Sequence, residues 1–395
     1  MDTQRTVLVL NQFALPSNCP GGTRHVEMFS LLENWRSIFI VGDRNYFSGE
    51  RIDTSDARFR TVRLLITGKT PARRAMGWLE YMVKAIFVGL KERNVDVIYA
   101  SSPHLFTPVA GWVLAKMMRA KLVVEIRDLW PESFIALDVI RTQGRMYKGL
   151  KALEKWIYDR ADWIVGVSVQ WKVYFQQNAP NKSFTAIPNG TDVAAFDLAK
   201  PAALDWGKHG SATNGLKFVF AGSHGPKDGL DLLLDAVGDF PEDLFVLIGN
   251  GTEKSKLADR VEREGLKNVL MLEPVTKAEL PSYLKLMDVG LHLVADWEVF
   301  KRGMSPNKLH DYLGVGLPVI SNAVGEPHHI LEVSRAGVGV SSGEISRGIR
   351  AMKMLERTEL RAMGQNGREW MLNNRSRPIV ASALEQVLNE VSKSG

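Results

Sequence analysis

Apolar residues gather in short runs along this chain, and each run is followed by a longer stretch with the spacing of an amphipathic helix. Most runs are nearly continuous Val, Ile and Leu, which is typical of strands buried on both faces of a parallel sheet. This alternation predicts βαβ units. In the first half, the predicted strands are 6–13, 37–42, 60–65, 96–100, 121–127, 163–168 and 184–188, and the predicted helices include 23–35, 73–93, 105–119 and 145–160.

The alternation stops between residues 194 and 215, where turn-forming residues replace the periodic ones, and we interpret this segment as a linker between two domains. A last helix is predicted over 377–392, because its apolar residues share one face; it either completes the second domain or crosses back to the first. The pattern predicts an α/β protein with two doubly wound, Rossmann-like domains in tandem. Strands of the second domain are predicted at 217–221, 244–248, 269–272, 289–294, 318–321 and 339–341.

Composition narrows the class of protein. The chain has 395 residues, which fits two or three domains, and its one cysteine, Cys19, excludes a disulfide framework. Residues 1–10 lack the apolar length of an export signal, and the longest uncharged apolar stretch, 105–115, is shorter than the roughly 20 residues of a membrane-spanning helix. We therefore expect a soluble, cytoplasmic protein. The net charge of +6 suits a phosphate-rich substrate, an anionic membrane or nucleic acid, and does not choose among them.

The strongest candidate site lies where a helix is predicted to begin, at Ser305-Pro306-Asn307-Lys308. Serine is a favoured N-cap and proline suits the first helical position, so the free amides and the positive end of the helix dipole would bind a phosphate. Lys308 opposes that dipole, and a bound anion would compensate for it. Asp311, about one turn later, would reach the ribose hydroxyls of the same ligand. An ordinary capped helix with a solvated acid explains the same residues, and both interpretations stay open.

Two glycine-containing loops follow the first predicted strand of each domain. Residues 221–230 contain Gly222, where backbone can approach a ligand, and Lys227, which offers a charge for phosphate. Residues 20–25 contain Gly22 and Arg24. Loops at the carboxyl ends of parallel strands are where such sheets bind ligands, although neither loop has Walker A or G-x-G-x-x-G spacing.

A third candidate is the charged segment 125–132, which directly follows a buried strand. Asp128 would orient or deprotonate an acceptor hydroxyl, and Arg127 would hold a phosphate; a surface network of Arg and Glu is the alternative. The chain has no D-x-D motif, the nearest segment being Asp296-Trp297-Glu298, and its histidines have no metal-binding spacing. We therefore expect no bound metal.

Two stretches, 69–93 and 141–157, combine basic with aromatic and aliphatic residues. Helices of this kind lie on anionic membranes, or pack on a sheet with their lysines in solvent. The residues leave both interpretations open.

The order of these motifs resembles the retaining GT-B glycosyltransferases of family four. The similar branch is the bacterial one that builds O-antigen, capsule and exopolysaccharide repeats, the N-acetylfucosamine transferases among them. The resemblance covers nearly the whole chain and rests on residues 21–25, 125–133, 187–192, 220–222, 248–251 and 305–320, of which 128–133 and 187–192 are the most specific.

The resemblance implies two domains with a cleft between them. Residues 1–195 would bind the acceptor and be joined by a C-terminal helix, 376–395, that crosses back; residues 196–375 would bind a nucleotide sugar as co-substrate, with no metal or other cofactor. The implied donor contacts are Lys227 and the amides of Ser305, Asn307 and Lys308 for the diphosphate, Gly222 beside them, Gly249 and Val275 for the base, Asp311, and Gly22 and Arg24 at the sugar and phosphates.

The chain also departs from the family. The family carries two glutamates at a fixed spacing, and here Asp311 holds the second position while Gly303 holds the first. Glu298 is a candidate replacement. The common acceptor-side histidine is Arg127 here, so the acceptor role falls to the neighbouring Asp128.

The resemblance therefore implies a retaining, metal-independent glycosyltransferase of cell-surface polysaccharide biosynthesis. Its donor would be a UDP-sugar, and its acceptor a glycan, lipid-linked through undecaprenyl diphosphate or not. It would be cytoplasmic, with peripheral contact with the anionic inner face of the cell membrane left open, and would have no nucleic acid partner. The alternatives are a nucleotide-sugar epimerase or phosphorylase on the same fold, and a non-catalytic partner subunit.

Overall fold

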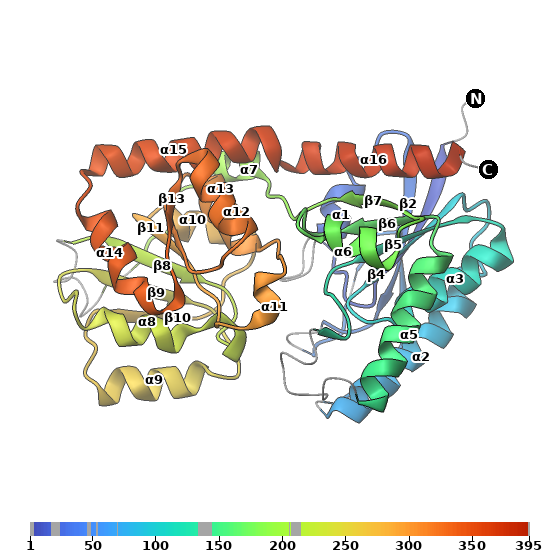
Figure 1. The fold of residues 1–395 in the computed structure, drawn as a ribbon, viewed down its shortest axis with the longest axis horizontal. Helices are drawn as coiled ribbons and strands as arrows, with labels where there is room; N and C mark the ends of the chain where they lie inside the picture. Colours follow the sequence, from blue (N-terminus) through green and yellow to red (C-terminus); the bar gives the residue numbers. More distant parts are fainter. Residues whose placement is uncertain are drawn as a thin grey trace. The chain divides into compact units, whose positions relative to one another are not determined.

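The computed structural model describes residues 4–16, 24–45, 49–52, 54–68, 70–132, 144–204, 206 and 215–393. The chain folds into two compact units (Figure 1), the first formed by residues 1–188 with 380–395 and the second by residues 189–379. Each unit is built on its own parallel sheet, which confirms the α/β prediction.

The sheet of the first unit has seven parallel strands in the order β3-β2-β1-β4-β5-β6-β7. The order turns around at β1, as it does in doubly wound folds. The strands are β1 (Arg5–Leu10), β2 (Trp35–Gly42), β3 (Phe59–Val62), β4 (Val97–Ser102), β5 (Lys121–Ile126), β6 (Trp163–Gly166) and β7 (Ser183–Ala186).

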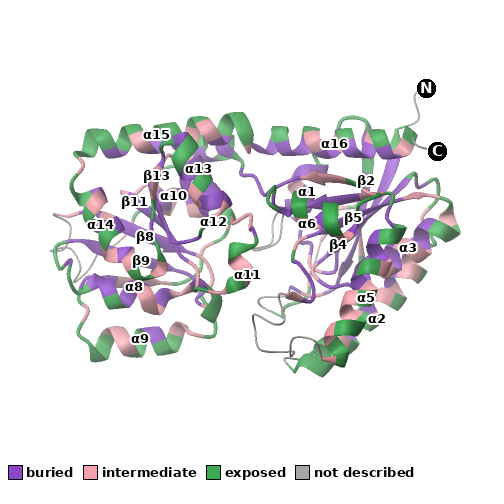
Figure 2. Ribbon diagram, in the orientation of Figure 1, coloured by how far each residue is buried: buried purple, intermediate pink, exposed green. Residues whose placement is uncertain are grey.

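Helices cover both faces of this sheet, because successive strand residues point to opposite sides. Leu8 and Leu10 of β1 belong to one core, shared with α2 (Pro71–Gly89), α3 (Phe106–Met118), α5 (Arg145–Arg160) and α6 (Trp171–Asn178). Val7 and Val9 belong to the opposite core, shared with α1 (Arg24–Phe29) and α16 (Arg377–Lys393). The strand interiors are therefore buried while the helices expose their outer faces (Figure 2).

The helix predicted over 23–35 is too long. α1 ends at Phe29 and β2 already begins at Trp35, so the last residue of the predicted helix belongs to a strand and residues 30–34 form the turn between them. The ring of Trp35 is buried, and its Nε1 donates to Oδ1 of Asn389 on α16 at 3.1 Å. Tertiary packing thus overrides the helical spacing here.

The sheet of the second unit has six parallel strands in the order β10-β9-β8-β11-β12-β13. They are β8 (Lys217–Ala221), β9 (Leu244–Ile248), β10 (Val269–Leu272), β11 (Val289–His292), β12 (Val319–Ser321) and β13 (Gly337–Gly339). Its helices are α7 (Val193–Leu198), η2 (Pro226–Asp228), α8 (Leu230–Val237), α9 (Lys254–Arg263), α10 (Leu280–Leu284), α11 (Glu298–Lys301), α12 (Asn307–Val315), α13 (Glu326–Ser334), η3 (Ser342–Glu344), α14 (Ile345–Lys353) and α15 (Arg357–Asn374).

The start of the predicted linker is helical. The carboxylate of Asp192 accepts a hydrogen bond from the amide of Ala195 at 3.0 Å and so caps α7, whose Val193 and Phe196 are buried. The two units meet in sequence at residues 188 and 189, whereas a boundary after residue 195 would cut α7. Of the rest of the predicted linker, residues 205 and 207–214 lie outside the described residues.

The C-terminal helix α16 returns to the first unit, as the GT-B resemblance implies. Its buried face is the apolar stripe seen in the sequence, and it packs in the same core as Val7 and Val9. None of the helices in the described parts of the chain is long and apolar enough to span a membrane. The residues of α16 in that core are Val380, Ala381, Leu384, Val387, Leu388 and Val391.

The packing of α16 predicts that Leu384→Ala destabilises the protein. Leu384 is fully buried, so truncation leaves a cavity that costs about 2–5 kcal/mol. We expect a lower urea midpoint, measured by circular dichroism. Gln386→Ala on the exposed face of α16 is the control and should change stability by less than about 0.5 kcal/mol. Equal midpoints for L384A and wild type would contradict the packing.

Candidate functional site

Two loops of the second unit touch at the carboxyl edge of its sheet. A Cβ atom added to Gly249, after β9, would lie 1.8 Å from the carbonyl oxygen of Gly222, after β8, and Gly249 has φ +149°. The amide of Gly222 also donates to the carbonyl of Ile248 at 2.9 Å. Only glycine fits at Gly249. The backbones of both loops therefore meet where parallel α/β sheets bind ligands.

Helix α12 begins beside these loops, but not with the predicted cap. Its N-cap is Pro306, and the first helical residue is Asn307. Ser305 does not cap the helix, because its hydroxyl oxygen accepts from the amide of Asn189 at 2.7 Å and its carbonyl from Nδ2 of the same residue at 2.5 Å. The prediction that Ser305 is the N-cap is wrong: its hydroxyl fixes the neighbouring loop instead.

The start of α12 nevertheless has backbone amides without helical acceptors. The first backbone bond of α12 runs from the amide of His310 to the carbonyl of Pro306 at 3.4 Å. The amides of Asn307, Lys308 and Leu309 precede it and lack an acceptor within the helix. Together with the positive end of the dipole, they favour an anion at this position.

Lys308 does not depend on a bound anion for its charge partner. Its Nζ pairs with the carboxylate of Asp228, which is 2% exposed, and lies 4.3 Å from the ring centroid of Phe220. The stem of Lys308 packs on Gly222, where an added Cβ would lie 2.1 Å from its Cε. Burial lowers the pKa of Lys308, while Asp228 acts in the opposite direction. The side chain therefore links α12 to the loop after β8.

Asp228 is itself held in place by its own loop. Its second carboxylate oxygen accepts from the hydroxyl of Ser223 at 2.5 Å. The neighbouring Lys227 is different: its side chain is exposed and has no ion pair with any described residue. Its carbonyl accepts from the amide of Ala295 at 2.9 Å, so the backbone is fixed while the ammonium is free. The loop thus contains Asp228, whose carboxylate is paired with Lys308, and Lys227, whose ammonium is available to a ligand.

His224, in the loop after β8, has an uncharged imidazole ring close to Gly249. It is fully buried, and neither ring nitrogen has a hydrogen-bond partner among the described residues. Burial, followed by the charge of Lys254, lowers its pKa to about 4. An added Cβ at Gly249 would lie 3.2 Å from its Nε2. A neutral imidazole with free nitrogens is therefore part of this edge.

The carboxylate of Asp311, in α12, already has two partners. Its Oδ1 accepts from the hydroxyl of Thr191 at 2.8 Å, and Nζ of Lys277 lies 2.5 Å from both carboxylate oxygens. Asp311 is buried, whereas Lys277 is partly exposed. Val275, two residues before Lys277, is half-buried against the core. Asp311 therefore presents an ion pair rather than a free carboxylate.

The first unit has a buried polar cluster at the end of β5. Arg24 donates to Glu125 at 3.2 Å, to the carbonyl of Ile187 at 2.6 Å and to that of Pro188 at 2.8 Å. Nε2 of His25 lies 2.6 Å from the other oxygen of Glu125. Burial opposes ionisation of Glu125, but His25 and Arg24 outweigh it and hold its pKa well below the usual range. The guanidinium of Arg24 is thus committed to internal acceptors.

The remaining predicted residues differ in their exposure. Arg127 is half-buried and Asp128 is exposed, directly after β5 in the first unit. Glu298 begins α11 in the second unit; its side chain is 74% exposed and lies 3.3 Å from Nζ of Lys301. Gly303, where the family pattern has a glutamate, is buried with φ +113°. Gly22 lies outside the described residues.

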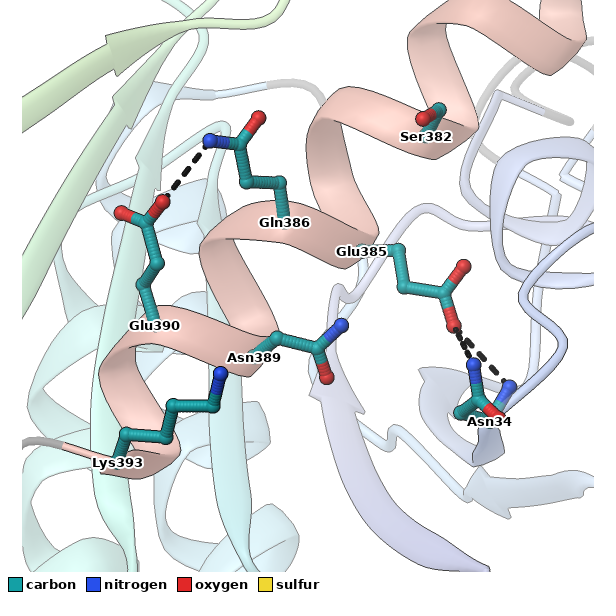
Figure 3. Close-up of a pocket in the computed structure, with 7 residues that line it drawn as sticks. All are labelled: Asn34, Ser382, Glu385, Gln386, Asn389, Glu390 and Lys393. Carbon is teal, nitrogen blue, oxygen red and sulfur yellow. Dashed lines mark hydrogen bonds between the residues drawn. The ribbon is translucent and has the colours of Figure 1, made fainter.

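A hollow of about 390 Å³ on the first unit has no predicted site residue in its lining (Figure 3). It follows the outer face of α16, where Glu385 accepts from the amide and Nδ2 of Asn34 at 3.1 Å each. Gln386 donates to Glu390 at 2.9 Å. The contacts of Glu385 fasten α16 to the turn before β2, and the Gln386–Glu390 bond lies within α16, which gives the hollow a structural explanation.

Comparison with protein families assigns both units. Residues 27–190 match the glycosyl transferase 4-like domain, and residues 215–356 match the glycosyl transferases group 1. The chain belongs to the group 1 glycosyltransferases. The two matched regions follow each other along the chain, one in each unit.

Two curated relatives of this glycosyltransferase are named for polysaccharide biosynthesis. It is 23% identical over 245 residues to WcaI of Escherichia coli (strain K12), named for colanic acid biosynthesis, with 60% of each chain covered. It is 24% identical over 205 residues to TuaH of Bacillus subtilis (strain 168), named for teichuronic acid biosynthesis, covering 51% of this chain and 50% of TuaH. The matches thus span 60% and 50% of the lengths of these relatives.

Solved structures show the GT-B fold. Sucrose-phosphate synthase from Thermosynechococcus elongatus superposes with a TM-score of 0.77 at 16% identity, covering 99% of this chain and 100% of that one. Anabaena HepE, solved with UDP-glucose, superposes with a TM-score of 0.66 at 17% identity and the same coverage. At these identities the likeness concerns the fold.

The buried pair predicts strong coupling between Asp228 and Lys308. Asp228→Asn leaves the Lys308 ammonium without its counter-charge, and Lys308→Met leaves a buried carboxylate unpaired, so each should cost about 3–5 kcal/mol. The double variant removes both charges and should be more stable than the sum of the singles by at least about 1 kcal/mol. Urea unfolding measures the cycle. Lys227→Met is the exposed control, and additive effects at 228 and 308 would refute the pair.

Proposed function

We propose that this chain is a retaining glycosyltransferase whose donor is a nucleotide sugar, a UDP-sugar in the first place. One observation carries the proposal: three amides without helical acceptors begin α12 beside the touching Gly222 and Gly249 loops. A diphosphate is the anion that suits several parallel donors at a helix start. Membership in the group 1 glycosyltransferases supports the transfer reaction, and HepE, solved with UDP-glucose, supports a uridine nucleotide.

Each part of the proposed donor (diphosphate, base, ribose and sugar) has its own proposed contacts. Lys227 supplies a free charge for the diphosphate, and the amides of Asn307 and Lys308 donate to it, with Ser305 fixing the segment before them. The base would lie near Gly249 and Val275. The ribose would meet the Asp311–Lys277 pair. For Gly22 and Arg24 a role at the sugar and phosphates remains the family-based proposal, with Arg24 acting through its buried contacts.

The proposed acceptor chemistry belongs to the residues after β5. Asp128 is exposed, so its carboxylate can accept the proton of an acceptor hydroxyl, and Arg127 can hold an acceptor phosphate. Glu298 would face the transferred sugar in place of the glutamate that Gly303 replaces. The names of WcaI and TuaH support an acceptor in cell-surface polysaccharide biosynthesis, which we propose to be a glycan, free or lipid-linked at the inner face of the membrane.

Isothermal calorimetry with UDP tests the donor site. Lys227→Met removes a charge-assisted contact to phosphate worth about 1.5–3 kcal/mol, so its Kd should rise roughly 10–100-fold. The side chain is exposed, and the fold should not change. Lys200→Met, also exposed in the second unit, is the matched control and should bind UDP like wild type.

Turnover decides among the reaction classes. UDP release from UDP-sugars should require an acceptor glycan. Interconversion of sugar nucleotides without acceptor would indicate an epimerase, and dependence on inorganic phosphate a phosphorylase. Neither UDP binding nor turnover with any donor would overturn the proposed function.

A further inference from the structure

Helix α2 has an apolar face that no described part of the protein covers. Its core side is formed by buried residues such as Tyr81 and Ala85. On the opposite side, large apolar residues recur every three or four positions and so form one stripe along the helix. This α2 stripe consists of Met76, Leu79, Val83, Phe87 and the C-cap Leu90, which are 52%, 45%, 43%, 66% and 37% exposed.

The preceding loop extends this surface. Leu65 is 70% exposed, and its backbone is bound to α2, because Glu80 accepts from the amides of Leu65 at 3.0 Å and Ile66 at 2.8 Å. An amphipathic helix that only packs on a sheet needs one apolar side. A second, contiguous apolar side exposed to water marks a surface that another phase or molecule covers. Exposed residues can be followed along α2 in Figure 2.

The charges beside the α2 stripe are almost all positive. Arg73 and Arg74 are exposed in the first turn of α2, and Lys84 lies next to the stripe. The one acid of the helix, Glu80, is mostly buried and pairs with Lys84 at 2.5 Å. Cations that flank an apolar stripe suit the anionic headgroups above a lipid interior, since their stems lie along the apolar layer while the charges reach the phosphates.

The core side of α2, opposite the stripe, packs near the proposed acceptor residues. Trp78, on that core side, stacks on His104 after β4 at 5.2 Å between ring centroids. It also contacts Trp130 edge-on at 5.7 Å, and Trp130 follows Asp128 in the same loop. The first turns of α2 are therefore at the carboxyl edge of the first sheet. A membrane bound at the stripe would bring a lipid-linked acceptor to the α2 side of the first unit.

We propose that the α2 stripe, together with Leu65, docks on an anionic lipid bilayer, with its apolar side chains in the interfacial layer and Arg73 and Arg74 at the headgroup phosphates. The occupant is a bilayer rather than a protein because the cationic rim complements a surface of uniform negative charge. The value of this docking for catalysis rests on the proposed lipid-linked acceptor; the docking itself does not.

Vesicle co-sedimentation of the full chain tests the inference. The wild type should bind vesicles of phosphatidylcholine with phosphatidylglycerol at low salt, bind less at high salt, and bind pure phosphatidylcholine weakly. Leu79→Glu with Phe87→Glu should lower the partition coefficient at least about tenfold, since two apolar side chains lose their burial. Arg73→Gln with Arg74→Gln should remove most of the salt dependence.

Matched controls distinguish vesicle binding by the α2 stripe from nonspecific binding by other exposed apolar residues. Met354→Glu with Leu372→Glu changes two exposed apolar residues of the second unit and should leave vesicle binding unchanged. All variants should bind UDP like wild type, so lost vesicle binding with intact UDP binding concerns this inference alone. Wild type that does not bind anionic vesicles would overturn it. So would unchanged binding by L79E/F87E, or a wild-type dimer that this variant dissociates.

Discussion

Every strand in both sheets pairs in parallel, and this constrains where chemistry can be placed. In a parallel sheet, all loops that follow strands lie at one edge, whereas the returning helices cover the faces. In the second unit this collects the loops after β8 and β9 and the start of α12. In the first unit it collects His104, Asp128 and Trp130. Both candidate sites are therefore consequences of topology, with side chains added at the edge.

The candidate site of the second unit depends on close contacts that leave no space for larger side chains. Gly249 must be glycine because the carbonyl of Gly222 occupies the place of a side chain. Lys308 crosses Gly222 to reach Asp228, which ties the helix start to the loop. The amides of Asn307, Lys308 and Leu309 at this helix start have no acceptor within the helix. We propose that this place seats the donor diphosphate, with Lys227 as its free cation.

The sequence predicted most of the strands and a helix start near residue 306, because buried parallel strands and helix starts leave local patterns. It predicted the residue roles around them less well. Ser305 looks like an N-cap, but its hydroxyl is used by Asn189, a partner 116 positions away in sequence. Lys308 looks unpaired because Asp228 lies 80 positions before it. His224, Lys277 and Thr191 gave no signal, since their importance arises only when separate loops meet.

Hydrogen–deuterium exchange with and without UDP tests the diphosphate seat most directly. The amides of Asn307, Lys308 and Leu309 have no helical acceptor, so they should exchange quickly in the free protein. If UDP binds as proposed, exchange should slow in peptides covering residues 305–309 and 222–229. UDP binding that leaves both segments unchanged and protects other parts of the chain would contradict the account.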